Sequence, residues 1–110
     1  MIRLTLLREG NRIAGFTCSG HANHGEHGND IVCSAVSAIT QTCVIGIQDV
    51  LKLPAAISVD ETEGIRCELE AGTPEADADR AGLLFDTMYA GLRAVEELYP
   101  GTLKFVDREV

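Results

Sequence analysis

Cys33 and His21 are the two residues whose types and spacing suit covalent chemistry. A cysteine protease needs a thiolate nucleophile, a base within hydrogen-bond reach and donors for the oxyanion. Cys33 follows Asp30, a good N-cap residue, and an apolar stripe with helical spacing runs on from it. As the third residue of such a helix, Cys33 would have its thiolate stabilised by the helix dipole, and the free N–H groups there could receive the oxyanion.

His21 is the candidate base. It lies twelve residues before Cys33, directly after Gly20 and at the end of a predicted strand, a spacing that a loop can fold back across. Taken singly, a cysteine in a helix is more often a small core residue, and a histidine in a polar loop is more often solvated. Because both residues flank one glycine-rich segment, 20–29, we favour a nucleophile and base pair.

Three neighbouring residues are secondary candidates. Asp30 either caps the helix, which we favour, or orients the imidazole and binds the substrate backbone. Ser37 lies one turn after Cys33, so its hydroxyl either reaches the active site or bonds back to the carbonyl of Cys33. Ser34, directly after Cys33, completes this set, and Gly20, directly before His21, is a further supporting candidate.

A zinc site is the strongest competing hypothesis. His21, His24 and His27 are spaced three residues apart and, with Cys18 or Cys33, would supply four ligands. Metal ligands usually rest on rigid elements, whereas these histidines lie among glycines and asparagine. We therefore expect no metal and no cofactor.

The first half of the chain predicts a hairpin and a helix. Ile2–Glu9 and Arg12–Ser19 alternate around a Gly10-Asn11 turn. Apolar residues then recur at helical spacing from Asp30 towards Pro54, over an arc wide enough to pack against both a sheet and another subunit.

The second half predicts the same pattern again. Residues 57–61 and 65–70 form a hairpin, and Thr73 caps a helix that has Pro74 as its first residue. A last strand follows near Leu103. The order ββαββα(β) predicts an α+β fold, with a mostly antiparallel sheet and two helices on one face, as one domain over residues 1–110.

Composition excludes several classes of function. The chain has 110 residues, 45% of them hydrophobic, and a net charge of −8, which disfavours direct nucleic-acid binding and anionic membranes and suits a basic protein partner. We expect a cytoplasmic protein, because no signal peptide, spanning segment or C-x-x-C pair is evident. Cys43 and Cys67 should be structural, and so should Cys18, although it could pair with Cys33 on oxidation.

The segments Gly20-His21-Ala22 and 28–38 (GNDIVCSAVSA) resemble the signature of the bacterial ribosomal-processing cysteine proteases. The resemblance implies a His21 and Cys33 dyad, a mobile flap over residues 22–32 and a homodimer. It also implies that the substrate is a large-subunit ribosomal protein whose N-terminal extension is cut after an aromatic residue. The non-enzymatic alternative is a ribosome-assembly factor that binds a basic ribosomal protein.

Overall fold

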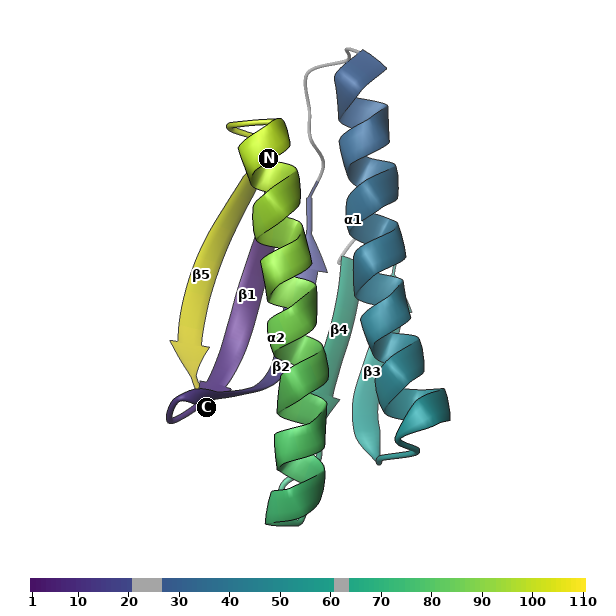
Figure 1. Cartoon of the computed structure of the whole chain (residues 1–110), viewed down its shortest axis with the longest axis vertical. Coiled ribbons are helices and arrows are strands. Elements are labelled where there is room, and N and C mark those ends of the chain that lie inside the picture. The colour runs from purple at the N-terminus through teal and green to yellow at the C-terminus, as the bar shows by residue number, and fades with distance from the viewer. Residues whose placement is uncertain (21–26, 61–63) are drawn as a thin grey trace.

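A sheet covered on one face by two helices positions the candidate site (Figure 1). The computed structural model describes residues 1–20, 27–60 and 64–110, and over these residues the sheet has five strands. The elements are β1 (Ile2–Glu9), β2 (Arg12–Ser19), α1 (His27–Ile45), the π-helix η1 (Gly46–Val50), β3 (Ala55–Asp60), β4 (Gly64–Leu69), α2 (Glu75–Leu98) and β5 (Leu103–Glu109). The predicted α+β fold class is confirmed.

The strands are ordered β3-β4-β2-β1-β5. Both predicted hairpins are present, and β2 joins them through antiparallel pairing with β4. β5 instead runs parallel to β1. Because parallel strands need a crossover connection, α2 passes over the sheet between β4 and β5. This crossover leaves β3 and β5 as the two edge strands.

The start of α1 differs from the prediction. The helix begins at His27, so Asp30 is its fourth residue and the prediction that Asp30 is the N-cap is wrong. Acidic residues are favourable both at the N-cap and within the first turn, so residue type alone does not separate these positions. Residues 27–32, expected in a mobile flap, belong to this helix, while residues 21–26 lie outside the described part of the chain.

The start of α2 also differs. Pro74 is the N-cap and Glu75 the first helical residue, so the prediction that Thr73 caps the helix is wrong. The Thr73 hydroxyl instead donates to the carbonyl of Glu70 at 2.6 Å. The Thr73 side chain therefore closes the turn that precedes the helix.

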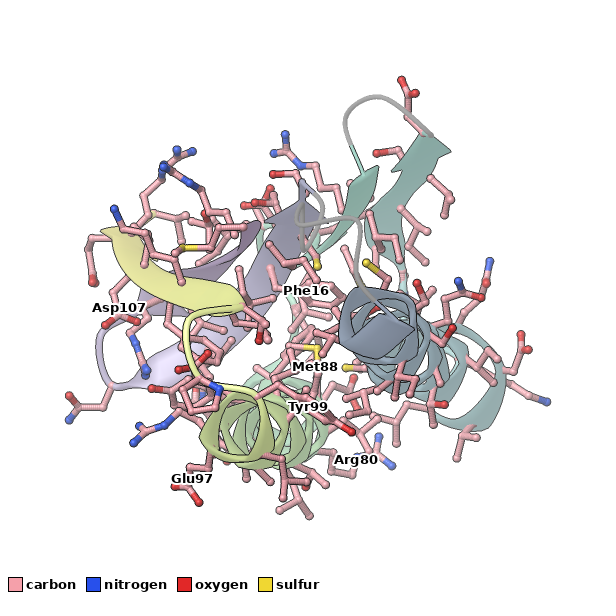
Figure 2. All side chains as sticks on the ribbon, turned by 90° about the horizontal axis from the view of Figure 1, so that it is seen from above. Phe16, Arg80, Met88, Glu97, Tyr99 and Asp107 are labelled. Carbon is pink, nitrogen blue, oxygen red and sulfur yellow. The ribbon has the colours of Figure 1, made fainter. Side chains whose placement is uncertain are left out.

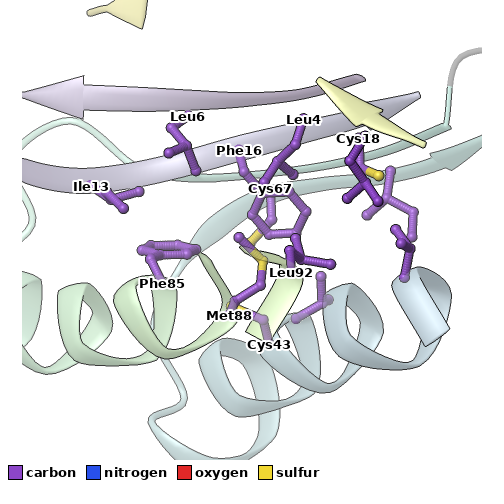
Figure 3. Close-up of a cluster of buried hydrophobic side chains, with 14 of the residues drawn as sticks. Leu4, Leu6, Ile13, Phe16, Cys18, Cys43, Cys67, Phe85, Met88 and Leu92 are labelled. Atoms are coloured by element: carbon purple, nitrogen blue, oxygen red, sulfur yellow. The ribbon is translucent and has the colours of Figure 1, made fainter. Parts of the chain in front are cut away.

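The core lies between the sheet and the helices (Figure 3). Phe16 of β2 meets Phe85 of α2 edge to face, with ring centroids 6.1 Å apart, and Met88 points between helices and sheet (Figure 2). Burying each large apolar side chain contributes about 2 kcal/mol. The segment Ile31–Val50 is long and apolar enough to cross a membrane, a property shared by core helices, and here its inner side packs on the sheet.

Gly64, the first residue of β4, permits a close backbone approach. Its φ is +89°, and a Cβ atom there would overlap the carbonyl oxygen of Cys18 near the end of β2. Gly72 has a similar φ of +85° but has nothing within 4 Å of a Cβ position. A substitution at Gly72 would therefore cause backbone strain alone, whereas a substitution at Gly64 would cause both backbone strain and steric overlap.

We predict that Gly64→Ala lowers the free energy of unfolding by at least about 3 kcal/mol, because the new methyl group must displace the β2 backbone. Gly72→Ala, the matched control, carries only the cost of a positive φ, about 1 kcal/mol. Urea unfolding of both variants measures the difference. Equal losses would show that the approach of β4 to Cys18 can relax.

Candidate active site

Cys33 lines a pocket at one end of the sheet. It is the seventh residue of α1, is half-buried and packs against the core. The pocket has a volume of about 230 Å³ and lies where β2 ends and β4 begins. The residues that line it are Ile2, Cys18, Ser19, Gly20, Cys33, Val36, Ser37, Thr40, Gln41, Val59, Asp60, Gly64 and Ile65.

One face of α1 forms the helical wall of this pocket. Ser37 and Gln41 follow Cys33 at four-residue intervals, so all three side chains share that face. Thr40 is fully buried, and its hydroxyl donates to the carbonyl of Val36 at 2.8 Å. Ser37 and Cys33 therefore line one pocket, whereas Ser34 is exposed and does not line it, and the predicted roles of both serines stay predictions.

Gly20 forms part of the opposite wall. Its φ is +89°, and a Cβ atom would overlap the carbonyl oxygen of Met1, so the chain leaves β2 by a path that only glycine follows without strain. Gly20 directly precedes His21 in the sequence. Gly20, which precedes the candidate base His21, therefore lines the same pocket as the candidate nucleophile Cys33.

Two candidate residues are not placed by the structure. His21 lies outside the described residues, and the side chain of Asp30 is likewise not described. Their predicted roles stay predictions. Among the described residues, no three His, Cys, Asp or Glu side chains come together as metal ligands. Since His21 and His24 fall outside this set, the zinc hypothesis is not tested.

The position of Cys33 in α1 differs from the prediction. The free N–H groups and the dipole act within the first turn of a helix. Cys33 is the seventh residue of α1 and lies beyond that turn. The prediction that Cys33 is the third helical residue, with unpaired N–H groups beside it, is wrong. Among the described residues, the side-chain donors that line the pocket include Ser37 and Gln41.

The other three thiols are buried and differ from Cys33 in accessibility. Burial and, to a smaller extent, the nearby Cys33 together raise the pKa of Cys18 to about 11. Burial likewise raises the pKa of Cys43 to about 12 and of Cys67 to about 11. Cys18 and Cys33 line one pocket, and all four thiols are free. The predicted structural role of Cys43 and Cys67 agrees with their burial.

Several pocket residues were missed in the sequence. Thr40 and Gln41 could have been found from their helical spacing to Cys33. Val59 and Asp60 had no such signal, because they reach the pocket only through the pairing of β3 with β4.

We predict that iodoacetamide at pH 8 alkylates Cys33 before the other three thiols. A thiol pKa of about 11 leaves only about one molecule in a thousand as the reactive thiolate at that pH, and burial blocks access as well. Peptide mapping after timed quenching measures the order, and the Cys33→Ala variant should stay unlabelled over the same interval. Labelling of Cys18 at a rate similar to that of Cys33 would contradict the prediction that burial protects Cys18.

The chain is similar in sequence to known cysteine proteases. The family model described as cysteine protease Prp matches residues 1–104. The ribosomal processing cysteine protease Prp of Bacillus subtilis is 32% identical over 107 residues, covering 94% of this chain and 95% of that protein. Its namesake from Staphylococcus aureus is 31% identical over 98 residues, covering 89% of each chain.

Solved structures share the fold. A Streptococcus mutans protein superposes with a TM-score of 0.79 at 25% identity, covering 100% of this chain and 96% of that one. The Staphylococcus aureus protease, solved in complex with a substrate peptide, gives 0.81 at 24% identity, covering 98% and 100%. With a family model that matches nearly the whole sequence, this chain belongs to the ribosomal-processing cysteine proteases.

Proposed function

We propose that the chain is an endopeptidase that removes the N-terminal extension of a large-subunit ribosomal protein, with Cys33 as nucleophile and His21 as base. The observation that carries this proposal is the pocket that Cys33 and Gly20 bound together, because Gly20 is covalently joined to His21. Relatives named for ribosomal processing supply the substrate class.

The chemistry follows from these two groups. His21 takes the proton of the Cys33 thiol, and the thiolate attacks the scissile carbonyl carbon. The tetrahedral intermediate collapses as His21 returns the proton to the leaving amine, which leaves an acyl thioester on Cys33. Water, deprotonated by His21, then hydrolyses the thioester, releases the carboxylate product and restores the thiol. No cofactor is needed for this sequence of steps.

The partner and setting are part of the same proposal. A net charge of −8 favours a basic ribosomal protein and disfavours direct contact with nucleic acid or an anionic membrane, and four free thiols suit the reducing cytoplasm. We also propose a homodimer, since Ile31 and Ile45 of α1 are each more than half exposed. Sedimentation equilibrium that gave only the monomer mass would contradict it.

We predict that the native chain cuts a peptide spanning the extension junction once, and that Cys33→Ala and His21→Ala each lower kcat by at least about a thousandfold. Mass spectrometry of the products measures the cut. Thr42→Ala is the matched control, because Thr42 also lies on α1 but donates to Ala38 away from the pocket.

Each alternative has its own result in this assay. Full activity in Cys33→Ala would remove the nucleophile from the proposal. No cleavage by the native chain, with peptide still bound, would favour the assembly factor. Stoichiometric zinc in the purified protein, lost together with the fold on chelation, would favour the metal site.

A further inference from the structure

The outer edge of β3 is a strand edge that the described chain leaves uncovered. β3 is the last strand of the sheet on the side opposite β5, and it pairs only with β4 among the described elements (Figure 1). An edge strand presents a row of N–H and C=O groups that another extended chain can pair with.

The register shows which groups of β3 face outwards. The Glu70 N–H donates to the Pro54 carbonyl just before the strand, so residue 54 faces β4. Because the hydrogen-bonding direction alternates along an antiparallel strand, the even-numbered positions of β3 also bond to β4. The N–H and C=O groups of Ala55, Ile57 and Val59 therefore point to the free edge. None of the backbone hydrogen bonds that the described residues form outside the helices and strands uses them.

This edge lacks the usual protection against strand pairing. β3 (AAISVD) has a single charged residue, at its last position, and no proline. The other edge strand, β5 (LKFVDRE), has four charged residues. Charged side chains are a common means of blocking edge pairing. The contrast indicates that β3, and not β5, is open to an extended peptide.

The end of β3 leads directly into the pocket of Cys33. Val59 and Asp60 line that pocket, and Val59 is 70% exposed. A strand added outside β3 would lie three strand spacings from β2, about 14 Å, which roughly four extended residues span. A peptide held on β3 can therefore continue into the pocket within a few residues.

We propose that β3 binds the substrate by strand addition. An extended, uncharged stretch of the extension peptide hydrogen-bonds to Ala55, Ile57 and Val59 and then crosses the pocket to Cys33. This inference rests on the proposed function and adds the place where the substrate backbone is held. The occupant is a peptide and not a second copy of the chain, because the edge is continuous with the pocket and strand pairing between copies would obstruct its entrance.

Backbone N-methylation of the junction peptide tests the pairing directly. Peptides carrying one N-methyl group at successive positions, none at the scissile bond, lose one donor each. Only alternate nitrogens face β3, so KM should rise about threefold to tenfold at every second position and stay unchanged between them, with kcat retained throughout. This two-residue period would not arise from side-chain recognition.

The protein variants are Val59→Pro and, as the control, Thr42→Ala. Proline removes the outward N–H at a position where edge strands accept it, and we expect KM for the unmethylated peptide to rise at least about threefold. Thr42 lies on α1 outside the pocket of Cys33, so KM for Thr42→Ala should stay near the native value. Circular dichroism verifies that both variants fold.

Three results would overturn the inference. If KM shows no two-residue period along the methylated peptides and is unchanged in Val59→Pro, strand addition is ruled out. The proposed protease function would still stand. Failure to cut the unmethylated peptide removes the proposed function and this inference with it. A fall in sedimentation mass for Val59→Pro, with KM unchanged, assigns the edge to a second copy of the chain.

Discussion

The packing of α1 against the sheet is the constraint on which the site depends. Val32 and Val36 are buried on either side of Cys33 in the sequence, with exposures of 0% and 3%. Burial of each contributes about 2 kcal/mol, so together they fix the rotation of α1 about its axis. Cys33 lies between these positions at the border of the core. The thiol is therefore directed to the strand ends and is held there by hydrophobic packing, without an ion pair.

The strand ends complete the site because glycines let their backbones approach closely. Gly20 passes Met1, and Gly64 passes Cys18, at distances that leave no room for a Cβ atom. These contacts bring β1, β2 and β4 together at the edge of one pocket. The same packing buries Cys18 while leaving Cys33 partly exposed, so the chain sets one accessible thiol beside one protected thiol. Val59 and Asp60 of β3 complete the lining of this pocket.

Much of this arrangement could be predicted from the sequence, and the exceptions have physical causes. Hairpin alternation and helical stripes located both hairpins and both α-helices, since periodicity reports which face is buried, but they did not predict the change from α1 to the π-helix η1. The helix starts were wrong at Asp30 and Thr73 because acidic and hydroxyl residues suit several positions around a helix terminus. The parallel placement of β5 and the contribution of Val59 depend on tertiary pairing, which local patterns do not contain. The dyad of Cys33 and His21 was inferred from residue chemistry and from the motif resemblance, and it is still a prediction.

The most direct measurement is the mass of a trapped acyl-enzyme. The native chain would be mixed with an ester analogue of the junction peptide, quenched in acid within the first turnover and digested for peptide mapping. A nucleophilic Cys33 predicts one acyl group per chain, attached through a thioester at Cys33 and lost on longer incubation. Substrate turnover without any adduct, or an adduct on Cys18 instead, would contradict the assignment of Cys33 as the nucleophile.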